Sequence, residues 1–273
     1  MKRSLIMLTA LAAALLLATP AFAAGAKNGI VFNSIPKVLP GNVSSVGFQA
    51  TQASQLGDGI TFLSSNKKHL KTVSVVMSSW ACETGGGATC VTTPGSTFTH
   101  PITLNLYATN VGNLPGSLIA SATKPFAIKY RPTSDTGINC NGDNTAWFSP
   151  ADSACYHGIV QTITFNFASL HLILPSSIVY GVAYNTSGYG AAPYGYSTAC
   201  AIAGNCAYDS LNVSAAAGIP ARGTDRYLSG LFYDSAAPGG QYCDGGTAGS
   251  GFFRLDDGCW TGNNPLVRFQ FQK

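Results

Sequence analysis

The chain has 273 residues, of which 46% are hydrophobic, 11% aromatic and only 10% charged. This hydrophobicity argues against a disordered chain, because apolar burial can offset the entropy lost on ordering. Without Lys2 and Arg3 of the expected leader, 13 basic residues face 11 acidic ones, an excess too small for a nucleic-acid-binding face.

The first 23 residues have the three parts of a secretory signal peptide. Residues 1–3 provide positive charge, residues 5–17 an apolar run, and Ala21-Phe22-Ala23 a small-x-small cleavage site. We expect cleavage after Ala23, which leaves one domain over residues 24–273. The apolar run is too short to span a bilayer comfortably, and no other stretch of about 20 apolar residues occurs. The sequence therefore predicts secretion, to the periplasm or the medium, and no membrane span.

After the leader, apolar and polar residues alternate with the two-residue period of half-buried strands. The clearest alternations are at residues 73–77, 102–107, 163–167, 178–184 and 267–271. Turns rich in Gly, Pro and Asn separate them, and no segment has the apolar stripe of a helix. This pattern predicts an all-β fold of about ten strands in two packed sheets, a single jelly-roll-like sandwich with long disulfide-closed loops.

All eight cysteines follow the leader, and in an oxidising compartment disulfides are the expected state. Because short loops close at the lowest entropy cost, we predict four local bridges: Cys82–Cys90, Cys140–Cys155, Cys200–Cys206 and Cys243–Cys259. Zinc is the alternative, but Cys-x2-Cys spacing is missing, and the histidines, at positions 69, 100, 157 and 171, are scattered. The sequence therefore predicts neither a metal nor a cofactor.

A loop rich in small residues carries Tyr189, Tyr194 and Tyr196. Tyrosine rings on a rigid scaffold can stack on the apolar face of a sugar, so these three are candidate ligand-binding residues. The alternative is that they pack the loop onto the sandwich, as we expect for Tyr180 and Tyr184 in the core.

Each tryptophan lies near a cysteine. We expect Trp80 and Trp260 to pack on disulfides, whereas Trp147, in a loop rich in Gly, Asn and Asp, is the one free enough to meet a ligand.

Catalytic motifs are scarce. Neither Gly-x-Ser-x-Gly nor His-Glu-x-x-His occurs, and Glu83 is the only glutamate, although pairs of Asp could supply the two carboxylates of a glycosidase. Tyr156 and His157 could transfer protons in a polysaccharide lyase, or simply begin a strand.

Acidic residues gather at Asp244, Asp256 and Asp257, with Asp143 in another turn. Calcium favours such oxygens, but turn and capping roles are the simpler interpretation.

Eight motifs are spread over residues 80–256: Trp80-Ala-Cys82, Cys90-Val-Thr-Thr-Pro-Gly95, Pro101-Ile-Thr-Leu-Asn-Leu-Tyr107, Tyr130-Arg-Pro132, Tyr180-Gly-Val-Ala-Tyr184-Asn-Thr-Ser187, Tyr208-Asp-Ser-Leu-Asn-Val213, Tyr242-Cys-Asp-Gly-Gly246 and Phe253-Arg-Leu-Asp256. Together they resemble a family of secreted bacterial proteins with disulfides and a β-sandwich fold, to which no activity is assigned. Residues 104–120 also resemble the strand–turn–strand unit of extracellular sandwich modules that bacteria anchor by sorting tails. From the strand-like alternation of residues 267–273 we expect no such tail here. The resemblance implies secretion and a sandwich, and supplies no catalytic residues.

The sequence thus favours a secreted, non-catalytic binding or structural protein of the cell exterior, with a polysaccharide or another cell-surface component as its partner. The alternative is a carbohydrate-active enzyme, a lyase or hydrolase, because the fold by itself does not decide function.

Overall fold

The computed structural model describes residues 29–51, 53–63, 69–184, 211–235, 242–244 and 251–272. Several sequence predictions lie outside these residues: the signal peptide at 1–23 with its cleavage site after Ala23, the Cys200–Cys206 bridge, and Tyr189, Tyr194 and Tyr196.

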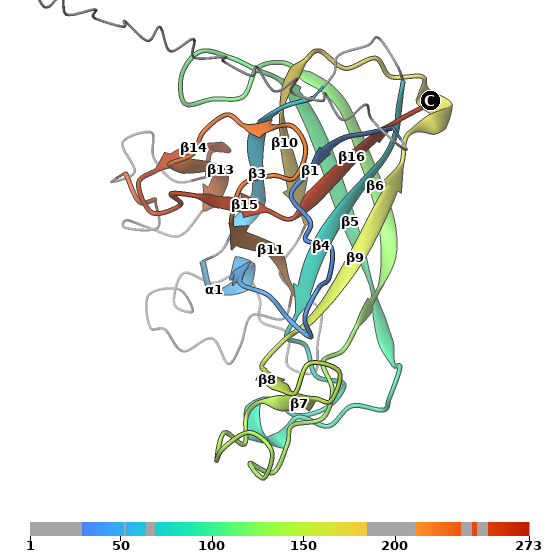
Figure 1. Cartoon of the computed structure of the whole chain (residues 1–273), viewed down its shortest axis with the longest axis vertical. Helices are drawn as coiled ribbons and strands as arrows, with labels where there is room; N and C mark the ends of the chain where they lie inside the picture. The colour runs from blue at the N-terminus through green and yellow to red at the C-terminus, as the bar shows by residue number, and fades with distance from the viewer. Residues whose placement is uncertain are drawn as a thin grey trace, which may run out of the picture.

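The described chain is all-β and forms two large antiparallel sheets (Figure 1). The first sheet contains β1 (Ile30–Asn33), β16 (Val267–Phe271), β4 (Leu70–Ser79), β11 (Leu211–Ala217) and β15 (Asn263–Pro265), with β2 (Ser45–Val46) paired to β11 and β9 (Ile159–Asn166) paired to β4. The second contains β14 (Arg254–Asp257), β13 (Gly230–Ser235), β3 (Ala53–Thr61), β10 (Ser177–Ala183), β5 (Thr97–Ala108) and β6 (Leu118–Lys129), with β12 (Thr224–Asp225) paired to β3.

Helical structure is minor in the part of the chain that the structure describes. It consists of α1 (Phe48–Thr51) and two short 3-10 turns, η2 (Gly87–Thr89) and η3 (Ala168–Leu170). The predicted β-sandwich is therefore confirmed, while the jelly-roll connection of its strands stays a prediction.

Each of the five strongest alternations lies in a strand or at its end, in β4, β5, β9, β10 and β16. Their apolar positions face the space between the sheets, where Leu104 and Leu106 of β5 are fully buried. Tyr180 and Tyr184 also join this core, as predicted. In β5, β9 and β16 the two-residue period predicts burial correctly, because one face of each strand packs on the other sheet. β4 and β10 are instead buried on both faces over most of their length, so the expectation of half-buried strands is wrong for them.

One side chain connects the two sheets along one side of the sandwich. Gln161 of β9 accepts a hydrogen bond from the Lys129 amide at 2.8 Å and donates one to the Ala127 carbonyl at 3.1 Å, both in β6. This bridge links the edge strands of the two sheets.

A small lobe lies beyond one end of the sandwich, around the hairpin of β7 (Trp147–Ser149) and β8 (Ala154–Tyr156) (Figure 1). The Cys140–Cys155 disulfide closes the loop of this lobe, and Cys82–Cys90 closes the loop after β4. The third disulfide, Cys243–Cys259, joins the segments before and after β14. Three of the four predicted bridges are thus confirmed. They secure polar loops that have little apolar surface of their own to bury.

Candidate functional site

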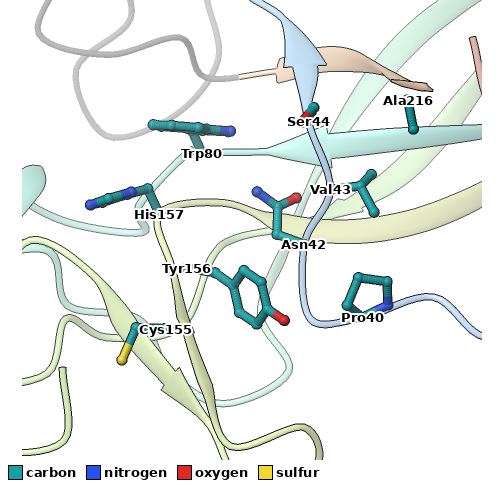
Figure 2. Close-up of a pocket in the computed structure, with 9 residues that line it drawn as sticks. All are labelled: Pro40, Asn42, Val43, Ser44, Trp80, Cys155, Tyr156, His157 and Ala216. Carbon is teal, nitrogen blue, oxygen red and sulfur yellow. The ribbon is translucent and has the colours of Figure 1, made fainter. Parts of the chain in front are cut away.

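A cleft of about 540 Å³ separates the β7–β8 lobe from the sandwich (Figure 2). Its walls come from the segment before β2, the end of β4, the end of β8 and one residue of β11. The lining residues are Pro40, Asn42, Val43, Ser44, Trp80, Cys155, Tyr156, His157 and Ala216.

Trp80 and His157 stack at one side of this cleft, with ring centroids 5.7 Å apart and planes inclined by 22°. Trp80 follows the last residue of β4, and its Nε1 donates to the Ser78 hydroxyl at 3.1 Å. That hydroxyl donates in turn to Oδ1 of the buried Asn42 at 2.8 Å. A hydrogen-bonded chain from the core therefore fixes the indole at the cleft.

Gly158 allows this close packing. A Cβ atom on Gly158 would lie 2.6 Å from Cδ1 of Trp80 and 2.7 Å from Nδ2 of Asn42, far inside normal contact. The absence of a side chain lets the segment between β8 and β9 pass close to Cδ1 and Nε1 of the indole.

His157 is paired with a carboxylate. Its Nε2 lies 2.9 Å from Oδ2 of Asp143, and both side chains are about half exposed, at 44% and 42%. The hydroxyl and amide of Thr145 donate to Asp143 and, with a smaller contribution from His157, lower its pKa to about 2. The carboxylate therefore stays ionised over the physiological range, and orients the imidazole.

Tyr156 is held in a different way. Its hydroxyl donates to Oδ2 of Asp152 at 2.7 Å, and the same oxygen accepts from the Gly41 amide at 2.8 Å. The hydrogen bond to Asp152 raises the pKa of Tyr156. A general base must give up its own proton first, so this bond opposes such a role for Tyr156, even though Tyr156 and His157 both line the cleft.

Trp147 does not fit the expectation that it is free to meet a ligand. It is only 7% exposed. Its Nε1 donates to the Gly158 carbonyl at 2.7 Å, and its ring packs on Tyr156 with centroids 5.7 Å apart. The loop that contains it folds back on itself, so its polar composition does not leave the indole in solvent.

Trp80 is the tryptophan that sequence reasoning missed. The sequence predicts only that Trp80 packs on a disulfide, whereas the structure shows that it stacks on His157 and lines the cleft. Its exposure depends on a neighbour far along the chain, and no local pattern identifies that neighbour.

The later acidic residues have structural partners. Asp244 forms a two-point ion pair with the buried Arg254, with both N–O distances 2.7 Å. Asp256 accepts from Nε1 of Trp260 at 2.8 Å, and Asp257 from the Ser229 hydroxyl. Across the described ranges, no group of three or more His, Cys, Asp or Glu side chains is placed to hold a metal ion.

No family model, curated protein or solved structure matches the chain. Among the residues that the structure describes, no helix is long and apolar enough to cross a membrane.

Proposed function

We propose that this protein is a secreted binding protein that holds a saccharide chain in the cleft between Trp80, Asn42, Tyr156 and His157. The observation that carries the proposal is the indole fixed at a cleft that places the polar side chains of Asn42, Ser44 and His157 beside apolar ones. Three disulfides among the described residues are consistent with an oxidising exterior.

The size and chemistry of the cleft support a sugar. A volume of about 540 Å³ lies within the roughly 300–1,000 Å³ of small-molecule sites. A pyranose has an apolar face that packs on an aromatic ring, which contributes about 0.5–1.5 kcal/mol beyond the area buried. Its hydroxyl groups need donors and acceptors, and Asn42, Ser44 and His157 are of the appropriate types.

A lyase or hydrolase is the second candidate, because His157 is paired with Asp143 at 2.9 Å and such a pair suits general-base chemistry. The proton held on Tyr156 by Asp152 weighs against it. We therefore place binding first, and the Tyr189, Tyr194 and Tyr196 loop stays a predicted addition to the same function.

A glycan array tests the proposal on the disulfide-bonded chain. We expect binding that Trp80→Ala reduces at least about tenfold, which corresponds to about 1.4 kcal/mol. Phe252→Ala is the matched control, because this aromatic side chain is 56% exposed and does not line the cleft. The control should bind as the wild type does.

The same glycans should be assayed for release of reducing ends or unsaturated sugars. If the wild type releases such products and His157→Gln does not, the lyase or hydrolase hypothesis is favoured instead. The proposal would be contradicted if the wild type bound no glycan, or if Trp80→Ala bound glycans as tightly as the wild type.

A further inference from the structure

His69 and His171 are in contact although 102 residues separate them. Their ring centroids are 5.3 Å apart, with the planes at 85°. His69 is half-buried beside the first residue of β4, and His171 is exposed directly after η3. We propose that these two imidazoles bind one divalent transition-metal ion of the Zn²⁺ and Cu²⁺ class, at a site separate from the cleft.

The hydrogen bond between the two residues prepares His69 as a ligand. Its Nδ1 lies 2.6 Å from the backbone carbonyl oxygen of His171. Because a carbonyl oxygen can only accept, Nδ1 carries the proton and Nε2 of the neutral ring keeps its lone pair. Metal-binding histidines typically donate their other N–H to a carbonyl or carboxylate in this way, which fixes both tautomer and orientation.

The backbone holds the two residues in place. The Leu70 amide donates to the Leu172 carbonyl at 2.7 Å, and His69 forms a β-bridge with Ile173. The Gln272 amide, after the end of β16, donates to the His69 carbonyl at 2.8 Å. These bonds tie together the residues next to both histidines, so little ordering remains to be done when an ion binds.

His171 has a left-handed backbone, with φ 49° and ψ 35°. This conformation is uncommon for residues other than Gly, and Asn, Asp and His adopt it most readily. It ends η3 and turns the chain toward β4. The histidine side chain therefore projects from a turn whose direction is fixed by hydrogen bonds on its C-terminal side.

The ring separation matches a shared ion. Zn²⁺ binds imidazole nitrogen at about 2.0–2.1 Å with tetrahedral angles, which places two bound ring centroids about 5.2 Å apart. The observed separation is 5.3 Å, and the exposed side chain of His171 can rotate to direct a ring nitrogen at the ion. Water would complete the coordination. Lys71 lies in β4, two residues after His69, and its positive charge opposes binding of the ion. We therefore expect a lower affinity than that of a site with three protein ligands.

Calorimetric titration tests the site on the disulfide-bonded chain without a polyhistidine tag. We expect one ion per chain, with Cu²⁺ bound more tightly than Zn²⁺ and no binding of Ca²⁺, which prefers oxygen. His69→Gln and His171→Asn should each weaken binding about tenfold or more. Asn is chosen at position 171 because it tolerates the left-handed backbone. His157→Gln is the control and should bind as the wild type does.

Two further measurements distinguish the loss of a metal-binding side chain from the loss of folded structure. Zn²⁺ should raise the thermal midpoint of the wild type but not of His171→Asn, and imidazole ¹⁵N shifts should move for His69 and His171 alone. Unchanged affinity in His171→Asn, loss of binding in His157→Gln, one ion per two chains, or no binding of either ion would overturn the proposal.

Discussion

Gly158→Ala tests whether the close packing of Gly158 against Trp80 maintains the shape of the cleft. Gly158 is buried and has no positive φ, so an alanine can adopt its backbone conformation. The new methyl group, however, would lie 2.6 Å from Cδ1 and Nε1 of Trp80. Since carbon contacts are optimal at about 3.5–4.0 Å, the indole or the strand must move by about 1 Å.

The magnitude follows from two opposing terms. Overpacking costs about 1–3 kcal/mol, whereas Gly→Ala stabilises by about 0.4–1 kcal/mol because the unfolded chain loses conformational freedom. We expect a net loss of about 1–2 kcal/mol, which lowers the thermal midpoint of a chain of this size by about 2–8 °C.

Urea unfolding and the three indole N–H signals provide the measurement. In Gly158→Ala, the Trp80 signal should shift while that of Trp260, which is bonded to Asp256, stays in place. Gly158→Ser, with one more heavy atom, should lose more stability. Wild-type stability together with an unshifted Trp80 signal would refute the packing argument.

Three further variants test the sandwich and its loops. Burial, and then the nearby Asp225, raises the pKa of Asp58 well above its usual value. The unfolded chain therefore releases this proton above about pH 4 while the folded chain keeps it, and stability falls as pH rises. Because the side-chain amide introduced by Asp58→Asn cannot ionise, the free energy of unfolding of this variant, measured in urea, should rise relative to that of the wild type above pH 4. A difference between the two that does not change with pH would contradict this. Replacing Cys140 and Cys155 by Ser opens a loop with a sequence separation of 15 and should cost about 3 kcal/mol, whereas equal stability of oxidised wild type and variant would show that the loop is held by other contacts. Phe269→Ala, at a fully buried ring between the sheets, should cost about 3–5 kcal/mol by the same assay, and a loss below 1 kcal/mol would mean that the core collapses around the gap.

Local sequence patterns were enough to predict five of the strands and three of the disulfides. Alternation is a local property, and the burial of one strand face follows from it whichever sheet lies opposite, as Leu104 and Leu106 show. The bridges were predictable for a similar reason. Cys82 and Cys90 are separated by only eight positions, so loop closure favours that pairing before any fold is known.

The contacts between residues far apart in the chain follow from the packing of the folded molecule. Trp80 and Trp147 both stand near cysteines, yet Trp147 is buried because the Gly158 carbonyl and the Tyr156 ring cover it. Trp80 instead lines the cleft, where His157 stacks on it. In the same way His69 and His171, scattered along the sequence, come into contact where the chain after η3 pairs with β4. Such contacts depend on the packing of whole strands, because no local period or spacing specifies a partner so distant in sequence.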